Sequence, residues 1–221
     1  MFATLTGLGL ASAAGLNAYI PLLAVGLLAR FTDLVPLGDA WLWIEHPVTL
    51  VTLAVLLVVE FAADKFPAVD SVNDVIQTVV RPTSGGIVFG AGASTVELSE
   101  ITGAASGAVA GDGTGISWVP VIAGVVVALL FHVAKAMTRV VTNGVSLGCS
   151  APLVSLAEDF VSLVTSLLAI LVPLLILILF PVMVVGGVLL VRRVRRARAE
   201  RHAARNQGAP DQGVPDHGHP G

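Results

Sequence analysis

Ionisable residues stand at the ends of three long apolar runs, and this arrangement limits what the chain can fold into. They are Glu60, Asp64 and Lys65 at the end of one run, His132, Lys135 and Arg139 at the end of a second, and Glu158 and Asp159 at the start of a third. Ionisable side chains at membrane depth are costly, and they usually mark a polar pathway or a binding site. The arrangement therefore predicts a membrane protein that crosses the bilayer several times around a charged interior.

The composition agrees with this prediction. The mean hydropathy is +0.89, and only 12% of the 221 residues are charged, against about 25% in soluble domains. The chain has room for roughly five or six spans of about 20 residues each. We expect an all-α, polytopic integral membrane protein with about six transmembrane segments, some of them broken or re-entrant.

The first apolar run, residues 1–29, carries no charge but contains several small or helix-breaking residues. Asn17 is the polar member of this set, so we expect the helix to break near it. Unwound backbone is tolerated inside a membrane where protein or water covers it. The interrupting residues are Gly7, Gly9, Gly15, Asn17 and Pro21.

A loop and two further spans follow from the same reasoning. Residues 30–46 are polar enough for a loop, with Trp41 and Trp43 expected at the membrane interface. The apolar segments 47–65 and 119–139 are predicted to cross the membrane.

A short amphipathic helix is predicted over residues 68–82. Four polar residues recur there at helical spacing and share one face. We expect the helix to end at Arg81 and Pro82, because proline lacks the backbone N–H that continues a helix. The residues of the polar face are Asp70, Asp74, Gln77 and Arg81.

The last apolar block, residues 160–191, has an ambiguous length. As one helix it would extend about 48 Å, which is too long for a hydrocarbon core of about 30 Å. It is also short for two complete spans. Pro173 and Pro181 are candidate break points, and the choice between one helix and two stays open.

The distribution of cations predicts the topology. Seven of the 12 Lys and Arg residues lie in 192–205, whereas the loops 30–46 and 97–112 are acidic. Positive residues favour the cytoplasmic side, so six spans with both termini in the cytoplasm are expected. We divide the chain into a transmembrane domain, 1–196, and a disordered cytoplasmic tail, 197–221. The basic segment is expected to contact anionic lipid headgroups rather than nucleic acid.

The candidate substrate or proton pathway collects the polar residues that adjoin the spans. Helical rise brings Glu60, His132 and the pair Glu158 and Asp159 to a similar depth on three helices. Histidine and carboxylates are the usual groups of a proton relay. The alternative is that these charges form structural ion pairs or snorkel to the interface. The full set is Glu60, Asp64, Lys65, Asp70, Asp74, Arg81, His132, Lys135, Arg139, Asn143, Glu158 and Asp159.

The sequence gives little support for a disulfide, a metal site or a catalytic motif. Cys149 is the only cysteine, so neither a disulfide within the chain nor a thiolate metal cluster is available. His46 and His132 lack metal-ligand spacing to another His or Cys. Nucleophile and phosphate-loop motifs are also absent. We therefore expect no metal, no cofactor and no enzymatic activity.

Three segments carry a family resemblance: EFAADKFPAVDSVNDVIQTVVRP over 60–82, HVAKAMTRVVTN over 132–143 and SLAED over 155–159. They resemble a bacterial integral-membrane family catalogued as a domain of unknown function. Its pattern reads E-x-x-x-D-K-x-P, then D and T-x-x-R-P, then H-x-x-K-x-x-T-R-x-x-x-N, then S-x-x-E-D. A Gly/Ser-rich stretch near 103–115 and the C-terminal tail depart from it. The resemblance implies a bacterial cytoplasmic membrane location and brings no activity with it.

Two functions remain in competition at this point. The first is a small membrane transporter or permease, in a proton-coupled form, for an anionic small molecule or lipid headgroup. The second is a membrane scaffold or assembly protein whose buried charges only pair helices. A homo-oligomer is compatible with either function. A lipid-modifying intramembrane enzyme is a third, weaker alternative, because no nucleophile or metal set supports it.

Overall fold

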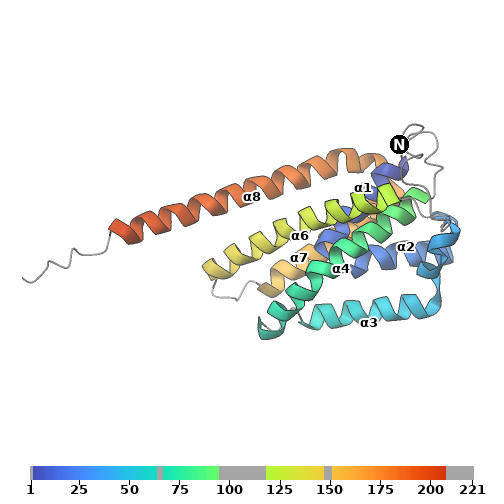
Figure 1. Ribbon diagram of the computed structural model, residues 1–221, viewed down its shortest axis with the longest axis horizontal. Helices are drawn as coiled ribbons and strands as arrows, with labels where there is room; N and C mark the ends of the chain where they lie inside the picture. The colour runs from blue at the N-terminus through green and yellow to red at the C-terminus, as the bar shows by residue number, and fades with distance from the viewer. Residues whose placement is uncertain (1, 64–66, 95–117, 147–150, 208–221) are drawn as a thin grey trace, which may run out of the picture.

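The computed structural model describes residues 2–63, 67–94, 118–146 and 151–207 (Figure 1). Their regular elements are all helical, so the predicted all-α class is confirmed for the part of the chain that is described. The elements are α1 (Phe2–Leu16), α2 (Tyr19–Phe31), the 3-10 helix η1 (Asp39–Glu45), α3 (Pro47–Ala63), α4 (Pro67–Ser94), α6 (Trp118–Ser146), α7 (Ala151–Leu171) and α8 (Pro173–Gln207).

The first apolar run is broken where the sequence predicts. Helix α1 ends at Leu16, α2 begins at Tyr19, and only Asn17 and Ala18 lie between them. The serine hydroxyl of Ser84 in α4 donates to the Ala18 carbonyl, 2.5 Å away. The predicted break near Asn17 is therefore confirmed.

The chain reverses at this break. At the start of α1, Gly7 lies beside Gly92 near the end of α4, whereas Ala18 reaches Ser84 about two turns earlier in α4. Helix α1 thus runs antiparallel to α4. Helix α2 then returns, since Gly26 packs against Leu50 at the start of α3. The two short helices form a hairpin with its tip at Asn17 and Ala18.

The start of α1 and the end of α8 consequently lie at opposite ends of the helix bundle (Figure 1). We call the end that holds Phe2 and η1 the hairpin end, and the end where α6 and α8 finish the basic end. By length and composition, one or two of the described helices can cross a membrane, so six crossings with both termini in the cytoplasm stay a prediction. The α1–α2 hairpin returns the first apolar run to the end of the bundle at which it began.

Small residues allow the helices around α1 to approach closely. Helix α1 is largely buried and contacts α4, α6, α7 and α8. A Cβ atom built on Gly15 would lie only 2.4 Å from the Cβ atom of Phe131 in α6. A Cβ on Gly85 of α4 would lie 2.3 Å from that of Ala128. Close backbone packing through Gly, Ala and Ser is typical of helices that associate in lipid.

Several polar side chains are buried in the bundle, and many large apolar side chains are exposed on its outside. Helix α3 shows this clearly, because Val58 is 67% exposed while Glu60 is 3% exposed. By length and composition, the segment Trp118–Met137 of α6 can cross a membrane, and η1 with α3, bent by 57°, is a second candidate among the described residues.

Proline has a different effect in α4 from the predicted one. Helix α4 continues to Ser94 with Pro82 inside it, so the predicted end at Arg81 and Pro82 is wrong. Arg81 and Pro82 are both buried in the bundle. Proline costs one backbone hydrogen bond, and packing on both sides of it keeps the helix intact. Residues 95–117, with the predicted acidic loop, lie outside the described residues.

The last apolar block forms two helices, which settles the open choice. Helix α7 ends at Leu171 and α8 begins at Pro173, while Pro181 lies within α8. Helix α8 continues to Gln207, so residues 197–207 are helical and not disordered as expected. Alanine, arginine and glutamate are strong helix formers, which explains this extension. The remainder of the tail lies outside the described residues.

The two tryptophans of the segment 30–46 differ in exposure. Trp43 is 46% exposed, as expected for an interface residue, but Trp41 is 7% exposed. The indole of Trp41 packs against Gly90 near the end of α4. Because glycine has no side chain, the indole ring fits against Gly90. Trp41 is therefore buried, and the expectation that it anchors at the interface is wrong.

Candidate functional site

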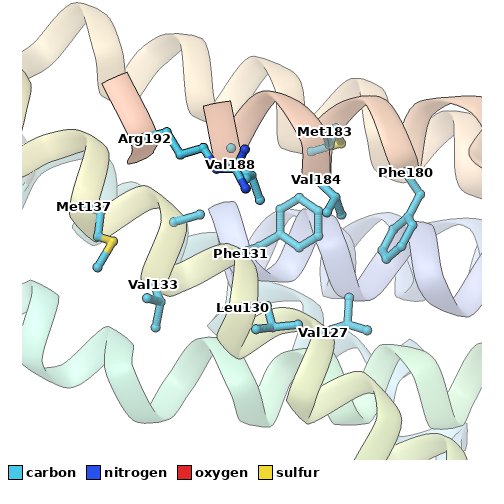
Figure 2. Close-up of a pocket in the computed structure, with 12 residues that line it drawn as sticks. Val127, Leu130, Phe131, Val133, Met137, Phe180, Met183, Val184, Val188 and Arg192 are labelled. Carbon is cyan, nitrogen blue, oxygen red and sulfur yellow. The ribbon is translucent and has the colours of Figure 1, made fainter. Parts of the chain in front are cut away.

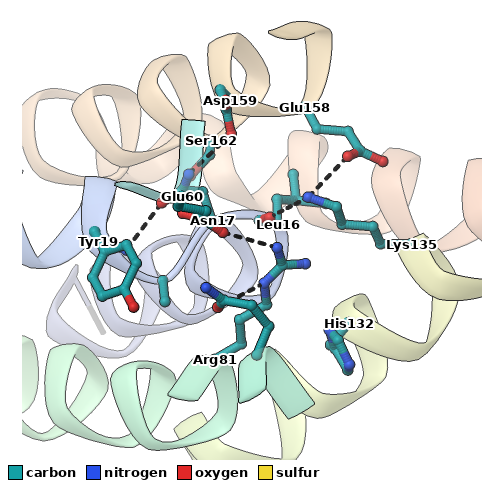
Figure 3. Close-up of polar contacts among 12 residues, drawn as sticks. Leu16, Asn17, Tyr19, Glu60, Arg81, His132, Lys135, Glu158, Asp159 and Ser162 are labelled. Atoms are coloured by element: carbon teal, nitrogen blue, oxygen red, sulfur yellow. Dashed lines mark hydrogen bonds and ion pairs between the residues drawn. The ribbon is translucent and has the colours of Figure 1, made fainter. Parts of the chain in front are cut away.

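The tip of the α1–α2 hairpin is held by one buried amide side chain. The Asn17 Oδ1 atom accepts hydrogen bonds from the backbone N–H groups of Tyr19, 2.9 Å away, and Ile20, 3.2 Å away. The Asn17 Nδ2 atom donates to Asp159 Oδ1 in α7 at 2.9 Å (Figure 3). Asn17 therefore caps α2 and ties the tip to a helix more than 140 residues later in the chain.

Side chains from two more helices donate hydrogen bonds to backbone carbonyls of α1. Lys135 Nζ of α6 donates to the Leu16 carbonyl at 2.8 Å, and the Ser162 hydroxyl of α7 donates to the Ala13 carbonyl at 3.0 Å. The last carbonyl groups of a helix carry partial negative charge, so a lysine there is favourable. With Ser84 of α4, side chains from three helices therefore hydrogen-bond to backbone carbonyls of the hairpin near its tip.

Two ion pairs lie next to the tip. Arg81 Nη2 is 3.0 Å from Glu60 Oε1, and these side chains are 1% and 3% exposed. The Arg81 Nε–H also donates to Gln77 Oε1 at 3.3 Å. Lys135 Nζ is 2.8 Å from Glu158 Oε2, with side chains 2% and 14% exposed. Figure 3 shows both pairs beside Asn17, with α3, α4, α6 and α7 each contributing a charge.

The ion pair of α3 with α4 has unused hydrogen-bonding capacity. Within the described residues, Glu60 Oε2 and Arg81 Nη1 are buried and have no hydrogen-bond partner. Buried polar atoms in native proteins almost always have a partner in protein, water or ligand. One acceptor and one donor are thus available for a small polar species at this pair.

The charges around the tip form one electrostatic group. Arg81, Lys135 and Asp159 are all close enough to act electrostatically on Glu60. The group contains three carboxylates, including that of Glu158, and two cations. Opposite charges brought together in this way can exchange partners over short distances.

His132 belongs to the same region but has a different neighbour. Its Nε2 atom lies 3.2 Å from the Thr78 hydroxyl of α4, and the residue is 6% exposed. Figure 3 shows His132 on the α6 side of Arg81, one turn before Lys135. His132 therefore lies in the region of the carboxylates, as expected, but its Nε2 atom contacts the Thr78 hydroxyl.

The remaining predicted site residues cannot be placed in this group. Asp64 and Lys65 lie outside the described residues. The side chains of four others lie outside them as well, although their backbone is helical: Asp70 and Asp74 in α4, and Arg139 and Asn143 in α6. Within the described part of the chain, no group of three His, Cys, Asp or Glu residues could hold a metal ion.

The sequence matches the family described as "Domain of unknown function (DUF4126)" over residues 4–193. The chain belongs to the DUF4126 family. This match confirms the resemblance to a family of unknown function. No curated protein and no solved structure matches the chain.

Several residues of this DUF4126 site were not among the predicted site residues. Asn17 was recognised as a break point and Gln77 as part of a polar face, but neither was assigned to the site. The signal for Asn17 was available, because it is a lone amide in an uncharged run of 29 residues. The hydroxyls of Ser84 and Ser162 gave no comparable signal, since serine in lipid-exposed helices is common at ordinary packing contacts.

Proposed function

We propose that the protein is a small, multi-pass transporter of the bacterial cytoplasmic membrane that carries a small anion together with a proton. The observation that carries the proposal is the meeting of two buried ion pairs at the tip of a broken helix hairpin. Discontinuous helices near the middle of the bilayer are a recurrent way of building substrate and ion sites in transporters. The apolar outer faces and polar interior support the membrane location.

The basic segment 192–205 sets the orientation in this proposal. Positive residues favour the cytoplasmic side, which places the basic end of the bundle in the cytoplasm. The hairpin then enters from the opposite side, and its tip reaches the two ion pairs. Helices α3, α4, α6, α7 and α8 cross the membrane, and α1 with α2 is re-entrant.

The ion pairs suggest how proton and anion would be coupled. While Glu60 is ionised, it neutralises Arg81. Transfer of a proton to Glu60 removes that negative charge and leaves the Arg81 guanidinium available to an anion. The pair Glu158 and Lys135 can work in the same way. One proton and one monovalent anion leave the net charge of the site unchanged, so the low-dielectric interior does not acquire an unpaired charge.

Transport in proteoliposomes tests this proposal. The purified protein is reconstituted with a pH dye inside the vesicles, and an acid-outside gradient is applied with acetate, lactate, phosphate or chloride as the anion. We expect internal acidification that depends on the protein and on one class of anion. In Glu60→Gln this acidification should fall at least about tenfold, since an amide cannot carry the proton.

Glu45→Gln provides the matched control, because Glu45 lies in η1, away from the ion pairs. We expect its transport to equal that of the unmodified protein. Loss of transport in both variants, or absence of protein-dependent acidification with every anion, would overturn the proposal.

A scaffold role is the second candidate, and the ion pairs themselves favour it. Arg81 and Lys135 each contact a carboxylate already, which is what helix pairing alone would require. In that case Glu60→Gln should lower the thermal stability in detergent while no anion produces acidification. The two functions are thus separated by flux measured alongside stability.

A further inference from the structure

An apolar groove runs between α6 and α8 on the outside of the bundle. Its volume is about 420 Å³, within the range of ligand-binding pockets. Figure 2 shows the side chains of both helices that point into it. The lining includes Val127, Phe131 and Met137 from α6, and Phe180, Gly187 and Arg192 from α8.

One end of the groove is closed by aromatic rings, and the other carries a charge. The rings of Phe131 and Phe180 are in tilted contact, with centroids 6.0 Å apart. Arg192 enters from the opposite end, and its guanidinium lies beside Val188 (Figure 2). Arg192 is exposed, and it belongs to the basic end of the bundle. The groove is therefore apolar along its length and positive at its mouth.

The length and the charge of the groove favour a phospholipid as its occupant. From Phe180 to Arg192 the helical rise gives a length of about 18 Å, similar to one leaflet of a hydrocarbon core about 30 Å thick. An extended acyl chain matches this length, and the positive charge of Arg192 complements an anionic headgroup.

We propose that this groove binds one acyl chain of an anionic phospholipid, with the lipid phosphate at Arg192. The proposal rests on the membrane location but does not depend on transport. The acyl chain lies between α6 and α8, where the groove offers contacts that bulk lipid does not. A guanidinium binds phosphate through paired N–H groups, which adds a preference for the anionic headgroup.

Two neighbouring glycines of α8 offer a matched test of the groove. A Cβ atom on Gly187 would face the groove and meet only the Cβ atom of Ala134, 3.7 Å away, whereas a Cβ on Gly186 would meet nothing within 4 Å. Gly187→Leu should therefore fill the groove without disturbing the helix, and Gly186→Leu should place the same side chain elsewhere. Arg192→Gln and Arg193→Gln form a second pair, because Arg193 is exposed but does not line the groove.

The measurement is native mass spectrometry of the full chain in detergent, titrated with phosphatidylglycerol and with phosphatidylcholine of the same acyl composition. We expect one phosphatidylglycerol to bind preferentially. Gly187→Leu should weaken binding of both lipids about tenfold or more. Arg192→Gln should reduce the preference for phosphatidylglycerol about fivefold, the equivalent of about 1 kcal/mol for one cation.

Several outcomes would overturn the proposal. Equal weakening by Gly187→Leu and Gly186→Leu would mean that the groove is not the site. Equal effects of Arg192→Gln and Arg193→Gln would remove the assigned headgroup contact. If Gly187→Leu changed the oligomeric state in the same spectra and left lipid binding unchanged, a second copy of the chain would be the occupant. Acyl-chain binding of this kind does not require flux, so failure of the transport proposal leaves this test unaffected.

Discussion

Helix α1 and the apolar part of α8, Pro173–Leu189, differ in position: α1 lies at the centre of the bundle and α8 at its edge. Ten of the 15 residues of α1 are buried, from Ala3 to Gly15. In α8, Ile176 is the only buried residue among those whose side chains the structure describes. The difference is one of size: α1 is built from Gly, Ala, Ser and a few Leu, and α8 from Leu, Val and Ile. Where lipid surrounds a protein, apolar character does not separate inside from outside, and close packing of small residues does.

The cations of the two regions differ in the same way. Lys135, which reaches the end of α1, is buried and bound to both a carboxylate and a carbonyl. Arg192, Arg193 and Arg196 of α8 are exposed. A buried cation depends on its partners, whereas an exposed one can be solvated. This contrast can be tested at matched positions in the centre and at the edge.

The largest effect is expected from removing the central cation. Lys135→Met removes the ion pair with Glu158 and the hydrogen bond to the Leu16 carbonyl, so the free energy of unfolding should fall by about 3–5 kcal/mol. Arg193→Met at the edge should change it by no more than about 0.5 kcal/mol. The measurement is unfolding by SDS titration in mixed micelles.

A double variant separates charge from packing at this position. Lys135→Met combined with Glu158→Gln removes both charges and should recover a substantial part of the lost stability. If the double variant were as unstable as Lys135→Met, the cost would lie in packing and not in an uncompensated carboxylate.

A glycine-to-alanine exchange should have opposite signs in the two helices. Gly15→Ala places a methyl group 2.4 Å from Phe131, and relieving that overlap should cost about 1–3 kcal/mol. Gly186→Ala meets nothing within 4 Å and should be neutral or stabilising by up to about 1 kcal/mol. Thermal unfolding in detergent measures both variants. A similar loss in both would show that the edge of the bundle is as tightly packed as its centre.

A smaller effect is expected at the hairpin tip. Asn17→Ala removes the hydrogen bonds to Tyr19, Ile20 and Asp159, and it should lower the free energy of unfolding by about 1–2 kcal/mol. Thr52→Ala removes an exposed hydroxyl on the outer face of α3 that bonds only within its own helix, and it should have little effect. Faster amide hydrogen exchange at Tyr19 and Ile20 in Asn17→Ala, but not in Thr52→Ala, would locate the change at the tip.

Much of the fold follows from local sequence signals. The break at Asn17, the apolar helices α3 and α6, and the inward position of Glu60 were all predicted, because apolar runs and lone polar residues are visible without a structure. Chain direction after a break was not predicted. A polar residue marks where a helix stops, but neither Asn17 nor its neighbours specify the angle at which the next helix leaves.

The sequence also did not predict which charged residues pair with each other in the site, for a related reason. Glu60 could in principle have met Lys135 or Arg139 as readily as Arg81. Each of these residues lies on an apolar helix that could rotate or shift by a turn with a similar hydrophobic gain. Arg81 reaches Glu60 because α4 packs against both α3 and α6, and such packing is a property of several surfaces together.

The sequence by itself determined that this chain forms apolar helices, that one of them breaks at Asn17, and that charged residues lie on their inner faces. Only the tertiary structure decided that the broken helix turns back, that Pro82 stays within α4, and that Arg81 binds Glu60. The physical reason is that the backbone carbonyls at the hairpin tip are bound by Ser84, Lys135 and Ser162, which fix where the chain turns. These side chains come from three distant segments, and packing of the whole bundle is what brings them to one place.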